Sequence, residues 1–145
     1  PQEMERTRAI ASCLVHLRNM FLFGDLPARD LLRVHSIVHV MDVAPDEHIM
    51  QQGEPPPACY FVLDGKINAC AGERVVAVRR KGDTLGIECL VHVIPSPVTL
   101  VAREHARLLV LPQDKLERLL DQYPRIGLRV YRRLSRQLIR RKPLR

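Results

Sequence analysis

The sequence has no tryptophan, only three tyrosines and three phenylalanines, and no long apolar run. No segment approaches the roughly 20 apolar residues that a membrane-spanning helix needs, and no signal-peptide pattern opens the chain. Aromatic side chains that could stack on bases are scarce, which counts against binding of single-stranded nucleic acid. The 145 residues are therefore predicted to form one cytoplasmic domain with a single core.

Patterns of catalytic and metal sites are missing as well. The six histidines show no metal-ligand spacing, and no Ser–His–Asp or Cys–His arrangement stands in a motif context. We therefore predict no enzymatic activity, no metal site and no resident cofactor. The four cysteines have apolar neighbours and no close partner in sequence, so they are interpreted as reduced core residues. They are Cys13, Cys59, Cys70 and Cys89.

The net charge of +7 belongs to the end of the chain. Residues 124–145 contain eight arginines, one lysine and no acidic residue, so the other 123 residues carry 14 basic and 16 acidic side chains. Because residues 1–123 are nearly neutral, they are not expected to form a broad basic surface that could bind DNA. We predict no nucleic-acid contact within this segment.

Helical patterns occupy both ends of the chain. Two are predicted in the first part, over residues 4–19 and from Pro27 to about residue 34, because proline suits the first turn of a helix. Two more are predicted at the end, over residues 112–122 and from Pro124 to about Arg141. The last has an apolar stripe with arginines on the opposite side. The stripe consists of Ile126, Val130, Leu134 and Leu138.

Short strand-like runs separated by turn residues lie between these helices. They cover residues 37–43, 48–51, 59–63, 66–70, 74–79, 98–102 and 106–111. Asp64-Gly65 between apolar runs is the strongest hairpin signal. Many short strands with regular turns predict an antiparallel sandwich or barrel.

Residues 82–102 have the sequence pattern of a phosphate-binding cassette. A glycine turn, an acidic residue and a short apolar helical run are followed by a strand that ends at Ala102. The segment lacks a cation, because no Lys or Arg occurs between Lys81 and Arg103. The glycines Gly82 and Gly86 are expected to adopt a positive φ in these tight turns.

The order and spacing of several motifs resemble the cyclic nucleotide-binding domain family over about residues 20–140. The motifs are Leu26-Pro27, Gln52-Gly53-Glu54, residues 60–67, residues 81–86, residues 109–111 and Tyr123-Pro124. The resemblance implies a mainly β fold with flanking helices, in which an eight-stranded antiparallel jelly roll (β-roll) is bracketed by N-terminal and C-terminal helices. Residues 1–145 would then be a single domain. Its parts would be N-terminal helices over 1–35, a β-roll over 36–111 with the cassette at 82–102, and C-terminal helices over 112–141.

The resemblance also implies a ligand site for cAMP or cGMP. In the family, a glutamate after the cassette glycine binds the ribose, and an arginine on the following strand pairs with the phosphate. Here Ile87 follows the glycine, the acid is Glu88, and the arginine position holds Ser96 beside Pro97, which lacks an N–H. The candidate ligand-binding residues are Gly86, Ile87, Glu88, Cys89, Leu90, Ser96, Pro97, Val98 and Thr99.

The predicted function is that of a non-enzymatic regulatory or sensor domain with weak or lost cyclic nucleotide binding. The short segment from Gly72 to Asp83 is similar to that of ether-à-go-go type channels, which favours the cytosolic part of a larger membrane channel or exchanger. The alternative is a genuine cAMP or cGMP sensor of a transcription regulator, a kinase or an exchange factor. The Arg-rich helix over residues 124–141 is a solvated surface, the interface of a homodimer, or a site for anionic lipid or nucleic acid.

Overall fold

The structure, a computed structural model, describes residues 2–91 and 94–140. Its chain forms two compact units. The helical unit lies within residues 1–36 and 118–145, and the β unit comprises residues 37–117. None of the described helices is both long and apolar enough to cross a membrane.

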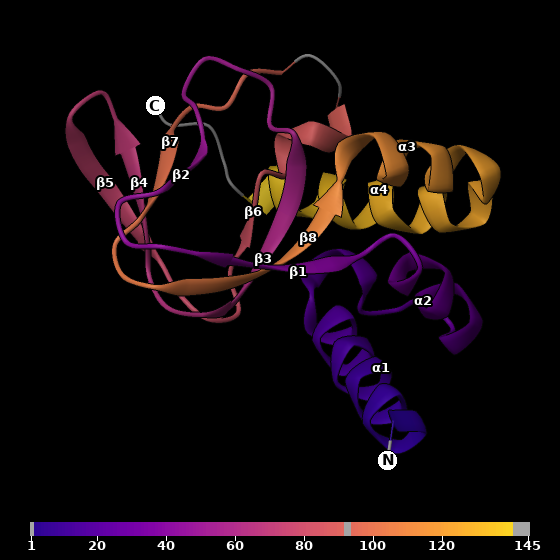
Figure 1. Cartoon of the computed structure of the whole chain (residues 1–145). Helices are drawn as coiled ribbons and strands as arrows, with labels where there is room; N and C mark the ends of the chain where they lie inside the picture. Colours follow the sequence, from indigo (N-terminus) through magenta and orange to yellow (C-terminus); the bar gives the residue numbers. More distant parts are fainter. Residues whose placement is uncertain (1, 92–93, 141–145) are drawn as a thin grey trace. The chain divides into compact units, whose positions relative to one another are not determined.

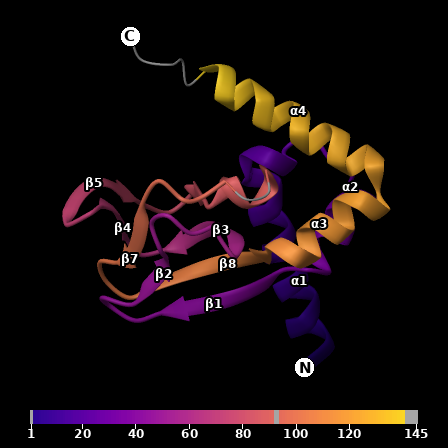
Figure 2. The ribbon, with the colours of Figure 1, turned by 90° about the horizontal axis from the view of Figure 1, so that it is seen from above.

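Eight antiparallel strands form two four-stranded sheets in the β unit, with strand orders β1-β8-β3-β6 and β2-β7-β4-β5. The strands are β1 (His39–Val43), β2 (His48–Met50), β3 (Ala58–Asp64), β4 (Ile67–Ala71), β5 (Arg74–Arg79), β6 (Thr84–Leu85), β7 (Thr99–Ala102) and β8 (Ala106–Pro112). The predicted eight-stranded roll is confirmed, and the β4–β5 hairpin projects from the unit in both views (Figures 1 and 2). The sequence did not reveal β6, because two residues are too short to show an alternating pattern.

The prediction of a hairpin at Asp64-Gly65 is wrong. The two strands that flank this turn belong to different sheets, since β3 pairs with β6 and β8 whereas β4 pairs with β5 and β7. A glycine is still required, because Gly65 has φ +88° and an added Cβ would collide with the His105 carbonyl oxygen. The hairpin lies one turn later, where Ala71 pairs with Arg74 across Gly72-Glu73.

The core of the β unit is built from alternate residues of both sheets. Ile67 and Ala69 of β4 are buried, and Asn68 between them is half-buried. This period of two places one face of each strand inside. The buried cluster comprises Val43, Met50, Ala58, Tyr60, Val62, Ile67, Ala69, Leu85, Leu100, Ala102, Ala106, Leu108 and Val110.

The helical unit contains both ends of the described chain. Its elements are α1 (Gln2–Asn19), the short 3-10 helix η1 (Phe21–Phe23), α2 (Ala28–His35), the second half of α3 (Gln113–Gln122) and α4 (Pro124–Arg140). The four predicted helices are confirmed, with Pro27 just before α2 instead of inside it. Most of α1 is exposed, and Leu17 is its buried residue.

The apolar stripe of α4 is buried within a single chain. Ile126, Val130 and Leu134 are 0–4% exposed, whereas Leu128 on another side of the helix is 53% exposed. The side chain of Leu138 and residues 141–145 lie outside the described part. The stripe is therefore already covered by the chain's own residues.

Two arginines of α4 are bonded within the helical unit, so the arginines of this helix do not all lie on one solvated side. Arg129 donates a hydrogen bond to the Asp25 carbonyl oxygen at 2.8 Å. Arg133 donates to the Phe21 carbonyl oxygen at 2.8 Å and lies over the Phe21 ring. These contacts attach α4 to the segment around η1. Arg132 and Arg136 remain exposed.

Candidate functional site

The cassette begins at a glycine that has no room for a side chain. The short strand β6 pairs with β3 through Tyr60–Leu85, which brings Gly86 against the carbonyl oxygen of Ala58. Gly86 has φ +74°, and a Cβ there would lie 2.5 Å from that oxygen. The predicted positive φ is confirmed at Gly86, and also at Gly82, whose φ is +95°.

The helical run of the cassette is the 3-10 helix η2 (Ile87–Val91). The Cys89 N–H donates to the Gly86 carbonyl oxygen at 3.1 Å, which closes its first turn. Ile87, Cys89 and Leu90 are buried, whereas Glu88 is half-buried. Ile87, which follows the glycine, is therefore a buried apolar residue, and the acidic side chain of Glu88 lies on a more exposed side of the helix.

The serine at the family's arginine position is used inside the loop. Ser96 is 2% exposed, its hydroxyl donates to the Val98 carbonyl oxygen at 2.6 Å, and it accepts from the Val98 N–H at 3.2 Å. A hydroxyl has one proton to donate. The proton of Ser96 is thus committed to the backbone two residues later.

A loop between β2 and β3 holds this part of the cassette in place. The Gly53 N–H donates to the Ser96 carbonyl oxygen, and the Ser96 N–H donates to the Glu54 carbonyl oxygen, both at 2.9 Å. The buried Thr99 hydroxyl accepts a hydrogen bond from the Gln52 N–H at 2.9 Å. Since Pro97 has no N–H, every donor of residues 96–98 is either engaged or lacking.

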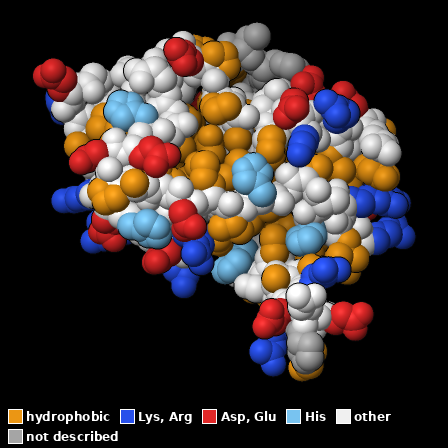
Figure 3. All heavy atoms as spheres, viewed as in Figure 1, with side chains coloured by type: hydrophobic (Ala, Val, Ile, Leu, Met, Phe, Trp, Pro, Cys, Tyr) orange, Lys and Arg blue, Asp and Glu red, His pale blue; other side chains and the backbone are white. Residues whose placement is uncertain are grey.

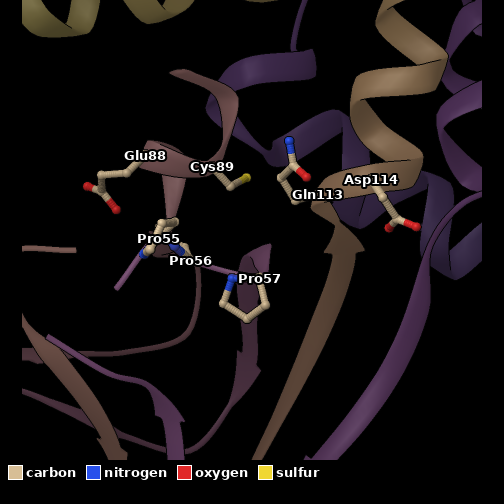
Figure 4. A pocket seen from close by; sticks show the side chains of 7 residues that line it. All are labelled: Pro55, Pro56, Pro57, Glu88, Cys89, Gln113 and Asp114. Carbon is tan, nitrogen blue, oxygen red and sulfur yellow. The ribbon is translucent and has the colours of Figure 1, made fainter. Parts of the chain in front are cut away.

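Glu88 and Cys89 face a cavity of about 420 Å³ within the β unit. Figure 4 shows that the Glu88 carboxylate and the Cys89 sulfur leave η2 on different sides. The cavity is lined by Pro55, Pro56, Pro57, Glu88, Cys89, Gln113 and Asp114. These residues include two carboxylates and no Lys or Arg, so this cavity does not favour an anion.

The structure therefore divides the predicted site residues between two places. Glu88 and Cys89 lie at the cavity, whereas Ser96 and Thr99 are bound to the loop of residues 52–54. Pro97 is exposed and Val98 is half-buried beside them. The acid and the serine are not lining residues of one described cavity.

Three arginines near the cassette could have supplied the missing cation. The side chains of Arg79, Arg80 and Arg103 are all exposed. The face in Figure 3 carries acidic and basic side chains mixed with histidines. Among the residues that the structure describes, no group of three or more His, Cys, Asp or Glu side chains is placed to hold a metal ion.

Sequence reasoning missed a pair of thiols next to the cassette. Cys59 of β3 and Cys89 of η2 are buried free cysteines whose side chains form a hydrogen bond. This hydrogen bond, followed by burial and by the negative charge of nearby groups, raises the pKa of Cys59 well above its ordinary value. Thirty positions separate the two cysteines, so no local pattern could have predicted their contact.

The neighbouring Tyr60 shares this environment. Burial raises the pKa of Tyr60 to about 12, and negative charge on Cys89 and Cys59 acts in the same direction. The surroundings of Cys59 and Tyr60 therefore favour neutral side chains.

Residues 40–123, more than half of the chain, match the family model of the cyclic nucleotide-binding domain. The chain belongs to the cyclic nucleotide-binding domain family. Its fold is accordingly that of a regulatory domain.

One curated relative with this domain is a cAMP-dependent protein kinase regulatory subunit from Hypocrea atroviridis, which is 23% identical over 104 residues. The alignment covers 72% of this chain and 22% of that protein. The chain thus spans about a fifth of the length of the curated relative that it matches.

Two solved structures of cyclic nucleotide-binding type have similar folds. The C-linker and CNBHD of a zELK channel, crystallised in the presence of cAMP, has a TM-score of 0.75 and 23% identity, and covers 94% of this chain and 70% of that chain. The regulatory subunit of a cAMP-independent protein kinase A from Trypanosoma brucei has a TM-score of 0.68 and 25% identity. It covers 76% of this chain and 40% of that one, and a triple mutant of it is described as bound to cAMP in the A site.

Proposed function

We propose that this chain is a non-catalytic regulatory domain of a larger protein and that its cassette does not bind cAMP or cGMP at physiological concentrations. The observation that carries the proposal is the state of residues 96–98. The hydroxyl and N–H of Ser96 and the N–H of Val98 are already hydrogen-bonded, and Pro97 has no N–H. A cyclic phosphate at this position would meet neither a guanidinium nor a free amide.

Energetics support a large loss of affinity. A buried anion must be compensated for its lost hydration, and a hydrogen bond to a charged group contributes about 1.5–3 kcal/mol. Losing one such bond lowers affinity by roughly one to two decades. Ile87, buried in the place of the family's glutamate, removes the acceptor for the ribose hydroxyl as well. Both losses act on the same ligand.

The Trypanosoma protein supports the plausibility of this state. It has a similar fold and is described as cAMP-independent, while its triple mutant is described as bound to cAMP. A protein of this fold is thus described as cAMP-independent, and its variant with three substitutions is described as bound to cAMP. We infer the same relationship for positions 87, 96 and 97 of this chain.

For the parent protein we propose a membrane channel or exchanger, with this domain on the cytosolic side. The zELK C-linker and CNBHD covers 94% of the chain, a share too large to leave out α1. The alternative is the regulatory subunit of a kinase, favoured by the curated relative, in which the domain would be a genuine cyclic nucleotide sensor.

Isothermal titration of the chain with cAMP and with cGMP tests the proposal. We expect no saturable heat up to millimolar ligand, because residues 96–98 offer a phosphate no cation and no free donor. Saturable binding of either nucleotide at micromolar concentration would overturn the loss of binding.

A matched pair of double variants tests whether positions 96 and 97 are responsible. Ser96→Arg with Pro97→Ala restores a guanidinium and an amide, and we expect cAMP binding to become measurable. Ser96→Ala with Pro97→Ala frees the same backbone without adding the cation, and we expect no binding. Thermal unfolding of both variants shows that each is folded before titration.

A further inference from the structure

Two cysteines from distant parts of the sequence meet behind the cassette helix. Cys59 of β3 is 0% exposed and Cys89 of η2 is 4% exposed, and both are free thiols. Their side chains are in hydrogen-bond contact. We propose that Cys59 and Cys89 form a reversible disulfide that fixes η2 to β3. This inference does not depend on the proposed loss of nucleotide binding.

Backbone contacts hold the residues next to both cysteines in place. Tyr60, next to Cys59, pairs with Leu85, and the Gly86 Cα lies against the carbonyl oxygen of Ala58. The Cys89 N–H donates to the Gly86 carbonyl oxygen. These contacts bring the backbone of β3 and the first turn of η2 together at the two cysteines, and such proximity is what a disulfide requires.

An oxidant reaches the pair from the Cys89 side. Cys89 lines the cavity of about 420 Å³ beside Pro55–Pro57 (Figure 4), whereas Cys59 is not among its lining residues. The oxidant class is a low-molecular-weight disulfide such as oxidised glutathione. The Cys89 thiolate attacks one of its sulfurs, expels one thiolate and forms a mixed disulfide.

The second step closes the protein disulfide. Cys59 releases its proton to solvent and attacks the Cys89 sulfur, and the second small thiolate leaves. In total two protein thiols are oxidised, and one small disulfide is reduced to two small thiols. Since the pKa of Cys59 is raised, its thiolate is scarce at neutral pH, which assigns it to the second, slower step.

The remaining two cysteines serve as internal controls. Cys13 lies in α1 and Cys70 in β4, and both are half-buried free thiols. They are at least as accessible as the proposed pair but have no cysteine hydrogen-bond partner given by the structure. Selective reaction of the buried pair would therefore reflect proximity and not exposure.

The test equilibrates the 145-residue chain with oxidised glutathione, quenches with acid, alkylates free thiols and maps the peptides without reduction. We expect a cross-link between the peptides of Cys59 and Cys89, reversed by dithiothreitol, with Cys13 and Cys70 recovered as alkylated or glutathionylated. Four alkylated cysteines, a stable mixed disulfide at Cys89 alone, or a cross-link to Cys13 or Cys70 in place of this pair would each overturn the proposal.

Thermal unfolding gives a second readout that does not rely on mapping. A cross-link that closes a loop of this length is expected to raise the melting temperature by about 5 °C or more. The rise should persist in Cys70→Ser and be absent in Cys89→Ser and in Cys59→Ala. If oxidation leaves the melting temperature of the parent chain unchanged, or raises it equally in Cys89→Ser, the disulfide does not fix η2.

Discussion

At Gly86 both the backbone conformation and the surrounding space exclude a side chain. Its φ of +74° is a conformation that L side chains rarely adopt, and an added Cβ would lie 2.5 Å from the Ala58 carbonyl oxygen. This oxygen belongs to the backbone of β3, so it cannot move aside as a flexible side chain would. The cassette helix can therefore lie this close to β3 only because residue 86 has no side chain.

We expect Gly86→Ala to destabilise the chain by about 2–5 kcal/mol. Roughly 1–2 kcal/mol comes from the left-handed conformation, and the collision adds about 1–3 kcal/mol, as overpacking does. Urea unfolding followed by circular dichroism measures the change.

Gly53→Ala is the matched control. Gly53 has φ +86°, but nothing lies within 4 Å of its Cβ position. Its cost should be limited to the conformational part, about 1–2 kcal/mol. Equal losses in the two variants would show that the contact with Ala58 is not restrictive.

Tyr60 gives a prediction about alkaline pH. Burial raises its pKa to about 12 in the folded chain, whereas an unfolded tyrosine ionises near about 10. The folded state therefore holds the proton more tightly, and this contribution is fully present below pH about 10 and is lost as the pH rises towards 12. The free energy of unfolding should fall across this window.

Urea unfolding at several pH values, together with phenolate absorbance of the folded chain, tests this expectation. The absorbance should include an ionisation step well above pH 10, and Tyr60→Phe should remove it. Tyr60→Phe should show a shallower fall but not a flat profile, because the raised pKa of Cys59 acts in the same direction. If no ionisation step above pH 10 is lost in Tyr60→Phe, the burial of the Tyr60 phenol is contradicted.

Among the elements, α4 has two sides with different roles. Ile126, Val130 and Leu134 are buried in one chain, whereas Leu128 and Tyr131 are 53% and 44% exposed. The buried stripe cannot meet a second copy without leaving its own chain. A homodimer through α4, if it forms, would use the exposed side.

We expect Val130→Glu to destabilise the chain by about 3–5 kcal/mol, because it leaves a buried charge without a partner. Leu128→Glu, on an exposed position, should change the free energy of unfolding by no more than about 0.5 kcal/mol. Thermal unfolding compares the two, and sedimentation of Leu128→Glu reports on a dimer. A folded, stable Val130→Glu chain would show that the stripe is not a core.

Periodicity predicted the elements whose pattern is local. The four long helices and seven of the eight strands were found because one face of each is apolar. Periodicity did not predict β6, which has two residues. It did not predict the partner strands of β3 and β4 either, because strand pairing is decided by contacts between residues far apart in the sequence. Asp64-Gly65 has the sequence of a hairpin turn, yet it connects two sheets.

At the scale of the whole molecule, the sequence predicted the fold and the broad role better than the site. The family motifs lie in turns and strands that the fold requires. The backbone N–H and carbonyl oxygen of Ser96 are bonded to Glu54 and Gly53, more than 40 positions away, and the contact of Cys59 with Cys89 depends on β6. Neither could be predicted from local spacing.

The hydrogen bonds of the Ser96 hydroxyl also affect which substitutions could restore nucleotide binding. Ser96→Arg alone removes the hydrogen bonds that shape the turn to Val98 and leaves Pro97 without an amide. Pro97→Ala alone frees an amide that has no cation beside it. Each single step costs stability and restores little binding, so only the joint change is favoured. Substitutions that arise one at a time would therefore meet a barrier, and the proposed loss of nucleotide binding should persist through sequence drift.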